Sequence, residues 1–126
     1  VWIPFLEASN QFDGPRFMSV QSKEVVQASL ESGRVLTYTD YSNSILPNFE
    51  RIQREGKVKR TTEMRFTARI ANDQMAHERG YFKSTVLRAN GETRISYSEF
   101  YMTLRKENGV WKILVDADSN LQGSIT

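Results

Sequence analysis

The feature that most constrains the fold is a pair of Asn-Gly dipeptides, Asn90-Gly91 and Asn108-Gly109, each set between two long runs rich in apolar and β-branched residues. Both residue types tolerate positive φ, so this dipeptide is the strongest short signal for a β-hairpin. We therefore predict a meander of four antiparallel strands in the C-terminal half. The predicted strands are Val58 to Ala71, Met75 to Ala89, Glu92 to Glu107 and Val110 to Asp118, with Asn72-Asp73 joining the first two.

The N-terminal half has the spacing of helices instead. Trp2, Phe5, Leu6 and Phe12 form one apolar stripe, which predicts an amphipathic helix that ends at Asp13-Gly14-Pro15. A short helix over Arg16 to Val20 and a hairpin of Glu24 to Leu30 with Val35 to Tyr38 follow. A third helix is capped by Thr39 or Asp40 and interrupted by Pro47. It resumes over Phe49 to Arg54 and ends before Gly56. The order predicts an α+β domain with N-terminal helices packed on a curved, mostly antiparallel sheet.

Composition narrows the class of protein. The 126 residues suit a single domain spanning 1–126, and 39% hydrophobic residues with 25% charged residues are typical of a globular chain. A net charge of only +2 argues against nucleic acid as a partner, and no apolar run is long enough to span a membrane. The absence of cysteine leaves the redox compartment open. Because the chain begins with Val1, we expect a soluble protein that is either cytoplasmic or exported after N-terminal processing.

Strand parity predicts which side chains face the helices. Phe100, Met102 and Leu104 alternate with polar residues and should point inward. A two-residue loop at Asn108-Gly109 then places Leu104 opposite Ile113, Met102 opposite Val115 and Phe100 opposite Ala117, and it puts Tyr101 beside Asp116 on the outer face. The same outer face should carry Arg65, Arg69, Arg79, Lys83, Glu99, Arg105 and Tyr97.

The hairpin at Asn90-Gly91 allows two registers. A two-residue loop would turn His77, Arg79 and Tyr81 inward. A three-residue loop, Ala89-Asn90-Gly91 with glycine in the left-handed conformation, turns Ala76, Glu78, Gly80 and Phe82 inward instead. We favour the second, because the first would bury Arg79 and Lys83 without partners. It leaves one inward carboxylate, Glu78.

Two segments resemble the nuclear transport factor 2-like superfamily, and more narrowly its polyketide-cyclase-like branch. They are the run from Ala76 to Phe82 and the run from Phe100 to Asp116, which contains Asn108-Gly109-Val110-Trp111-Lys112-Ile113. The resemblance implies a cone-shaped, cystatin-like fold that encloses a pocket, commonly in a homodimer paired through the outer sheet face. The superfamily contains both enzymes and non-catalytic assembly domains, and its known catalytic sets do not map onto this chain. His77, for example, has no second histidine to pair with.

Glu78 is the central candidate for function. On an apolar inner face it would suit a general acid or base, and its structural alternative is to accept hydrogen bonds from Tyr38, Ser98 or a helix N-terminus. The predicted ligand-binding residues are Trp2, Phe5, Tyr38, Tyr41, Glu78, Ser98, Met102 and Asp116. Asp116 and Asp118 lack a histidine neighbour, so we predict strand-end solvation and no metal site. Phe66, Phe82, Phe100 and Trp111 are expected to be core residues.

Three hypotheses of function follow from these residues. The leading one is a homodimeric domain that binds a small apolar or weakly acidic ligand in a mostly apolar pocket, without a cofactor. The second is a lyase or isomerase that moves a proton on a small hydrophobic ring or polyketide-like substrate, with Glu78 as base and a tyrosine as hydrogen-bond donor. The third is a dimeric assembly module whose pocket is filled by phenylalanine and methionine side chains.

Overall fold

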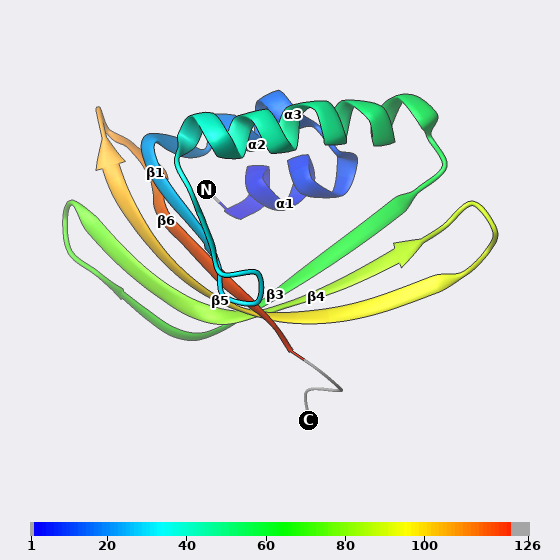
Figure 1. Cartoon of the computed structure of the whole chain (residues 1–126). Coiled ribbons are helices and arrows are strands. Elements are labelled where there is room, and N and C mark those ends of the chain that lie inside the picture. The colour runs from blue at the N-terminus through cyan, green and yellow to red at the C-terminus, as the bar shows by residue number, and fades with distance from the viewer. Residues whose placement is uncertain (1, 122–126) are drawn as a thin grey trace.

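A computed structural model describes residues 2–121 as three helices over one strongly curved sheet (Figure 1). The helices are α1 Trp2–Gln11, α2 Gly14–Ser19 and α3 Tyr38–Glu55. The strands are β1 Gln21–Ser29, β2 Arg34–Leu36, β3 Lys59–Ala71, β4 Met75–Leu87, β5 Thr93–Glu107 and β6 Val110–Leu121. The predicted order of elements is confirmed, and most boundaries shift by only a few residues.

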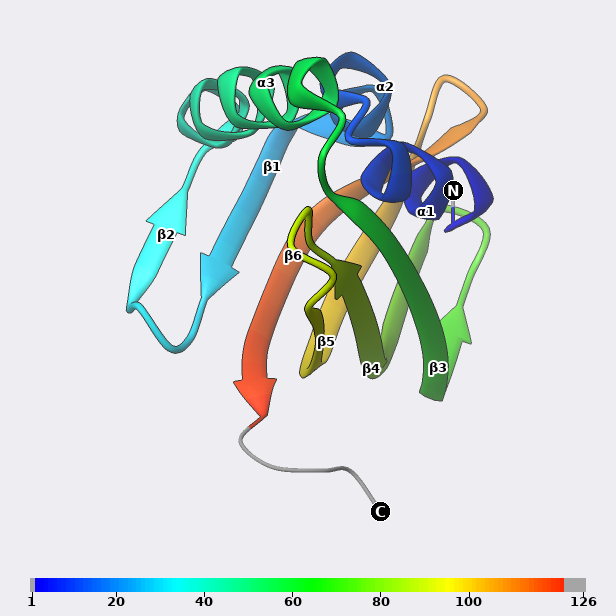
Figure 2. The same ribbon diagram turned by 90° about the vertical axis from the view of Figure 1, so that its right-hand side faces the viewer.

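The six strands form a single sheet in the order β2-β1-β6-β5-β4-β3. Every neighbouring pair is antiparallel except β1 and β6, which run parallel. The helices lie across the concave face, and α1 sits inside the cup that the sheet forms (Figures 1 and 2). The predicted α+β class, with N-terminal helices on a curved and mostly antiparallel sheet, is confirmed.

The concave face is filled largely by aromatic rings. Phe100 is fully buried on β5, and its ring centroid lies 4.6 Å from that of Phe82 and 5.7 Å from that of Phe66. Phe5 of α1 packs 5.2 Å from Phe17 of α2, which joins the helices to this cluster. Large rings bury much apolar area with little conformational freedom, so they account for much of the hydrophobic stabilisation of this fold.

The β4–β5 hairpin has the three-residue loop that parity favoured. Arg88 lies opposite Glu92 and donates its backbone N–H to the Glu92 carbonyl, and Gly91 adopts a φ of 84°. Glu78 is therefore paired with Met102 on the concave face, and its exposure is only 3%. The prediction that Glu78 points inward is confirmed, because the alternative register would have buried charged side chains without partners.

A bulge in β3 makes one prediction from the alternation of side chains wrong. Thr67 has no partner on β4, since Phe66 pairs with Gly80 and Ala68 pairs with Arg79. The extra residue reverses the alternation, so Arg69 lies opposite Glu78 on the inner side of the sheet and not on the predicted outer face. Gly80 permits this geometry, because a Cβ at that position would lie 1.9 Å from the Arg65 carbonyl oxygen.

A second bulge, at Leu114 of β6, corrects the predicted pairing of β5 with β6. The two-residue loop and the pair Leu104 with Ile113 are confirmed, but beyond Leu114 Met102 faces Asp116 and Phe100 faces Asp118. The predicted pairs with Val115 and Ala117 are wrong for the same reason. Asp116 consequently points inward and is 3% exposed, instead of lying beside Tyr101 on the outer face.

The helix ends differ in detail from those expected. Phe12 itself takes the left-handed φ of 54° that ends α1, and Asp13 caps α2 by accepting a hydrogen bond from the Arg16 backbone N–H. The α3 helix begins after Thr37 and continues through Pro47, so the predicted interruption is wrong. Proline removes one backbone donor, but the inner face of α3 packs on the core on both sides of it, through Tyr41 and Phe49.

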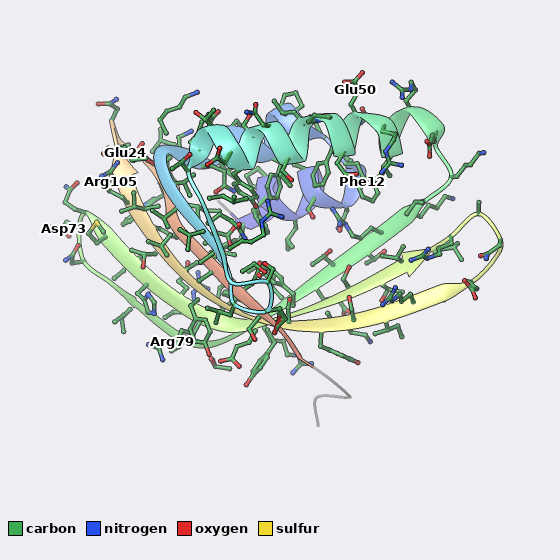
Figure 3. The ribbon with its side chains drawn as sticks, in the orientation of Figure 1. Phe12, Glu24, Glu50, Asp73, Arg79 and Arg105 are labelled. Atoms are coloured by element: carbon green, nitrogen blue, oxygen red, sulfur yellow. The ribbon has the colours of Figure 1, made fainter. Side chains whose placement is uncertain are left out.

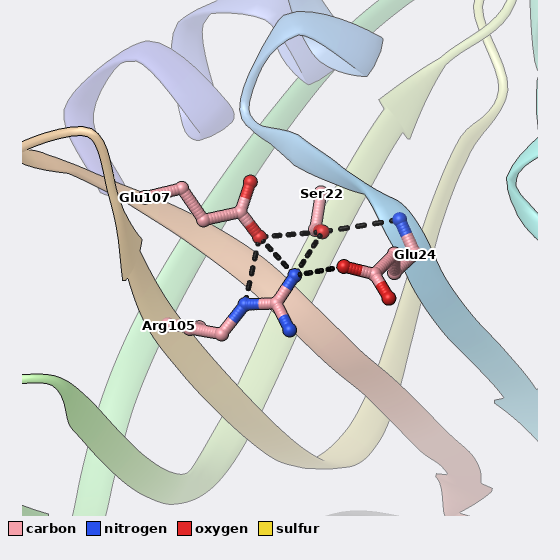
Figure 4. Close-up of polar contacts among 4 residues, drawn as sticks. All are labelled: Ser22, Glu24, Arg105 and Glu107. Carbon is pink, nitrogen blue, oxygen red and sulfur yellow. Dashed lines mark hydrogen bonds and ion pairs between the residues drawn. The ribbon is translucent and has the colours of Figure 1, made fainter.

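Arg105 ties β5 to β1 on the outer side of the parallel strand pair (Figure 4). Its guanidinium donates to Glu107 at 2.6 Å and to Glu24 at 2.7 Å, while the Ser22 hydroxyl donates to Glu107 at 2.7 Å. Two carboxylates thus neutralise one guanidinium, which lowers the pKa of Glu107 through the hydrogen bonds from Ser22 and Arg105. We interpret this cluster as a structural clamp.

Candidate functional site

A cavity of about 310 Å³ opens where the N-terminus of α1 meets the β3–β4 end of the sheet. Its wall consists of Trp2, Arg69, Ile70, Ala71, Ala76, Glu78, Leu104 and Trp111. Six of these eight side chains are apolar or aromatic, and the two charged groups are adjacent in the sheet. A mostly apolar hollow with a few convergent polar atoms is typical of small-molecule sites.

Glu78 is the polar centre of this cavity. One carboxylate oxygen, Oε1, accepts a hydrogen bond of 2.8 Å from the Trp2 indole Nε1, and the other, Oε2, accepts from Arg69 Nε in an ion pair. The Glu78 side chain is 5% exposed and that of Arg69 is 57% exposed, so the carboxylate is inside while the guanidinium reaches toward water. An oxygen of an ionised carboxylate can accept more than one hydrogen bond, which leaves Glu78 able to receive a ligand donor.

Aromatic rings hold both partners of Glu78 in place. The Trp2 ring lies 5.6 Å from Phe5 in an edge-on arrangement and 5.9 Å from Phe66. The guanidinium of Arg69 stacks at 4.0 Å over the Phe66 ring, a favourable cation–π contact. The site therefore has a fixed geometry that depends on α1, β3 and β4 together.

The structure does not bring all the predicted ligand-binding residues together. Trp2 and Glu78 border the cavity together. Phe5 and Met102 are buried in the core, and Ser98 lies opposite Phe82 near the middle of β5. The Tyr38 hydroxyl accepts a hydrogen bond from Lys23 Nζ at 3.1 Å near the surface, so neither it nor Ser98 supplies the hydrogen bond to Glu78 that the sequence had suggested.

Tyr41 and Asp116 form a separate polar pair beneath α3. The Tyr41 hydroxyl donates to Asp116 Oδ2 at 3.4 Å, and both residues are buried. Burial and, to a lesser extent, the negative charge of Asp118 raise the pKa of Asp116 to about 7, although the Tyr41 hydrogen bond acts in the opposite direction. Burial also raises the pKa of the Tyr41 phenol well above its usual value. Neither residue borders the cavity at Glu78.

Six of the eight residues of the cavity wall were absent from the predicted ligand-binding set, and two of these six had been assigned to a different environment. Trp111 was expected in the core, but it is half-buried and borders the cavity. Arg69 was expected outside, and the only signal of its true position is Gly80, the one glycine within a predicted strand. Glycine inside a strand marks a bulge or a close backbone approach, and here it marks the bulge that turns Arg69 inward.

No cluster of three or more histidine or acidic side chains in residues 2–121 has the arrangement of a metal site. In the same part of the chain, no helix has the length and apolar character needed to cross a membrane.

Comparison with known proteins identifies the architecture. Neither a protein-family model nor a curated protein matches the sequence. Solved structures do match: a ketosteroid isomerase-like protein from Erwinia carotovora atroseptica aligns with a TM-score of 0.73 at 19% identity, over 97% of this chain and 92% of that one. A Xanthomonas campestris protein resembling a calcium/calmodulin-dependent protein kinase II association domain gives 0.75 at 16% identity, over 98% and 84%.

A third matching structure is described as having a cystatin-like fold. A nuclear transport factor 2-like protein with a cystatin-like fold from Novosphingobium aromaticivorans aligns with a TM-score of 0.74 at 12% identity, over 98% of this chain and 79% of that one. Sequence identities this low support a shared architecture but not a shared chemistry, which depends on the residues of the site. The chain therefore has the cystatin-like fold of the nuclear transport factor 2-like proteins, as the resemblance in its sequence predicted.

Proposed function

We propose that the cavity at Glu78 binds a small, flat, mostly apolar molecule that carries one weakly acidic hydroxyl group. The observation that supports this proposal is Glu78 itself, a carboxylate that is 3% exposed in an otherwise apolar wall. Trp2 and Arg69 satisfy one lone pair on each oxygen, so a ligand hydroxyl can donate to a remaining one. The terminal nitrogens of Arg69 can donate to the ligand in return.

The walls set the expected shape of this ligand. Trp2 and Trp111 are broad aromatic surfaces, and Leu104 and Ile70 add aliphatic surface. A ring of roughly the size of a substituted phenol suits a cavity of 310 Å³, since small-molecule sites begin at about 300 Å³. The ring would lie against the indoles while its hydroxyl reaches Glu78.

Both tryptophans of the chain border this cavity, which provides a direct assay. Their indole N–H signals in a ¹⁵N–¹H spectrum should shift in a saturable manner with 4-ethylphenol. Ethylbenzene, which lacks the hydroxyl, should bind at least about tenfold more weakly, because one hydrogen bond to a charged group contributes about 1.5–3 kcal/mol.

Two variants test the position of the ligand. Glu78→Gln should abolish the preference for 4-ethylphenol over ethylbenzene, while the matched variant Glu63→Gln, on the exposed face of β3, should retain it. Ala76→Phe should block both probes by filling the cavity. If neither indole signal moves with either probe while the spectrum remains that of a folded protein, the cavity is not a binding site of this kind.

The proton-transfer hypothesis would use the same carboxylate as a base. It requires a tyrosine hydroxyl facing the substrate, but Tyr41 donates to Asp116 and Tyr38 contacts Lys23. We therefore propose binding and assign no reaction.

We also propose that two copies of the chain pair through the convex face of the sheet. This face carries Arg79 (Figure 3), whose guanidinium lies 5.4 Å from the ring centroid of Tyr101, and the half-buried Tyr81 and Tyr97. Tyrosine and arginine are enriched at protein interfaces, and one structural neighbour resembles an association domain. Sedimentation should show a dimer that Tyr97→Glu converts to monomer and that Glu50→Lys, on the solvent side of α3, leaves intact. A monomeric wild-type chain would contradict this proposal.

A further inference from the structure

The convex face of the sheet has two halves of different character. Residues directly opposite each other in neighbouring strands point to the same face, so the strand register defines one row of side chains that crosses the whole sheet on the convex side. From β3 to β2 this convex row consists of Ala68, Arg79, Tyr101, Ala117, Ala28 and Val35. Its charged and aromatic members lie on β4 and β5, whereas the half on β6, β1 and β2 is uncharged and ends in Val35, which is 70% exposed.

The two large side chains on β4 and β5 are held in fixed positions. Arg79 Nε donates to His77 Nε2 at 3.1 Å, and the Arg79 guanidinium lies 5.4 Å from the Tyr101 ring centroid. The Tyr101 hydroxyl donates to the Glu99 carboxylate. A surface that is already ordered loses less conformational entropy when a partner binds to it. Arg79 and Tyr101 therefore present a constant shape beside the low, uncharged half of the convex row.

A second copy of the chain matches the convex row when the row is reversed. A twofold axis that is parallel to the strands and lies between β5 and β6 sets the β3 end of one sheet on the β2 end of the other. Each large side chain then faces an alanine. The three facing pairs are Tyr101 with Ala117, Arg79 with Ala28 and Val35 with Ala68. This axis passes through the middle of the strand order, where the convex faces of two curved sheets come closest (Figure 1).

The alternative twofold axis, perpendicular to the strands in the plane between the sheets, gives a poorer match. It sets each strand on its own copy, so that Arg79 faces Arg79 and Ala117 faces Ala117. The two guanidinium groups repel each other, and facing alanines lack partner atoms for dispersion contacts. The neighbouring row of the convex face also favours the parallel axis, which sets Val26, a 42% exposed side chain, on the His77 ring.

We propose that two copies of the chain pair through the convex row, with the twofold axis parallel to the central strands and Tyr101 of each copy seated on Ala117 of the other. Packed sheets are commonly rotated by about 30° relative to each other, so the pair nearest the axis, Tyr101 with Ala117, is fixed most closely. This inference rests on the dimer proposed above and specifies which residues meet in it.

Complementary variants test the central pair. Tyr101→Ala leaves two alanines facing each other, and Ala117→Tyr sets two tyrosines in one place, so each change alone should raise the dimer dissociation constant at least about tenfold in sedimentation. An equimolar mixture of the two variants should recover the dimer, because every tyrosine then faces an alanine again. Ser44→Tyr, on the exposed side of α3, should leave the dissociation constant unchanged. Full affinity in both single variants, or no recovery in the mixture, would overturn the inference.

Spin labels distinguish the two axes, since the chain contains no cysteine and Val35→Cys provides one labelling site per copy. With strands about 4.8 Å apart and sheets about 10 Å apart, the two labels should lie about 25 Å from each other for the parallel axis and about 10 Å for the perpendicular one. Mixing labelled Val35→Cys with labelled Ala68→Cys should add a short distance only for the parallel axis. A dimer with two Val35→Cys labels about 10 Å apart would overturn this inference alone, whereas a monomeric wild-type chain would overturn the dimer as well.

Discussion

Glu78 and Asp116 are equally buried, each with 3% exposure, yet their surroundings differ in every other respect. Glu78 has a cation, Arg69, and an indole donor, Trp2, on its two oxygens. Within residues 2–121, Asp116 receives only a long hydrogen bond from Tyr41, and it has a second acid, Asp118, two residues away on the same face. Equal burial therefore does not mean equal surroundings, because the partners of the two carboxyl groups differ.

The same contrast extends to the bulges that place these groups. In β3 the extra residue Thr67 brings a cation to the carboxylate, whereas in β6 the extra residue Leu114 turns two acids inward. One bulge creates a satisfied pair beside a cavity, and the other creates an acidic pair under a helix. Both ends of the comparison can be tested through unfolding free energies.

The largest effect is expected from Gly80→Ala, which attacks the bulge that brings Arg69 to Glu78. The new Cβ would lie 1.9 Å from the Arg65 carbonyl oxygen and 2.8 Å from the Phe100 ring, so the backbone itself must shift. We expect a loss of about 4 kcal/mol or more in urea unfolding. Gly33→Ala is the matched control for glycine chemistry, since nothing lies near a Cβ there, although its φ of 65° makes a smaller loss expected. Equal losses in the two variants would show that the bulge is not tightly packed.

Asp116→Asn should change the pH dependence of stability. The pKa of Asp116 rises from 3.8 to about 7 on folding, so the native state takes up a proton between these values and the free energy of unfolding falls as pH rises through that window. At about 1.36 kcal/mol per pKa unit, the upper limit of this fall is roughly 4 kcal/mol. Asp116→Asn should lack this fall. The free energy of unfolding of the variant minus that of the wild type should therefore increase from pH 4 to pH 8.

The exposed Asp73 supplies the control for that measurement, because it lies in the β3–β4 turn (Figure 3). Asp73→Asn should track the wild type across the whole pH range. Using the change with pH also cancels the cost of the extra amide hydrogens in the Asp116 variant. A parallel pH profile for Asp116→Asn and wild type would mean that Asp116 is ionised in the folded protein at neutral pH without cost.

Glu78→Gln should lower the free energy of unfolding at neutral pH, in contrast to the pH-dependent gain expected from Asp116→Asn. The glutamine oxygen can still accept from Trp2, but the ion pair with Arg69 is lost, and hydrogen bonds to charged groups contribute about 1.5–3 kcal/mol. Because Arg69 is partly exposed, we expect a loss near the lower limit, about 1.5 kcal/mol, that shrinks in high salt. Chemical denaturation with urea at low and high sodium chloride measures both effects. Stabilisation by Glu78→Gln would remove the contrast with Asp116.

Much of the fold could be predicted from local chemistry. Asn90-Gly91 and Asn108-Gly109 specified their hairpins, because few other residues adopt positive φ without strain. Glu78 was placed correctly because the competing register carried an obvious cost, two buried cations without partners. Where a wrong arrangement is expensive for a single residue, sequence reasoning succeeds.

The bulges at Thr67 and Leu114 could not be predicted in the same way. A bulge shifts parity by one residue, and the polar side chains that it turns inward, Arg69 and Asp116, look like ordinary outer-face residues until their partners are known. The partner of Asp116, Tyr41, lies on α3 and is far away in sequence, and Glu78 becomes the partner of Arg69 only through the register that the bulge creates between β3 and β4. The part of the structure that depends on these bulges therefore became visible only in three dimensions.

The smallest effects should come from removing the neutral donors at the two acids. Trp2→Phe deletes the indole N–H that bonds Glu78 at 2.8 Å while keeping an aromatic ring against Phe5, and Tyr41→Phe deletes the hydroxyl that bonds Asp116 at 3.4 Å. The shorter bond to an ion-paired carboxylate should contribute about 1 kcal/mol and the longer bond about 0.5 kcal/mol. Urea unfolding of both variants at pH 7 measures the two losses side by side. If Tyr41→Phe cost more than Trp2→Phe, Asp116 would depend on its Tyr41 donor more strongly than Glu78 depends on its Trp2 donor.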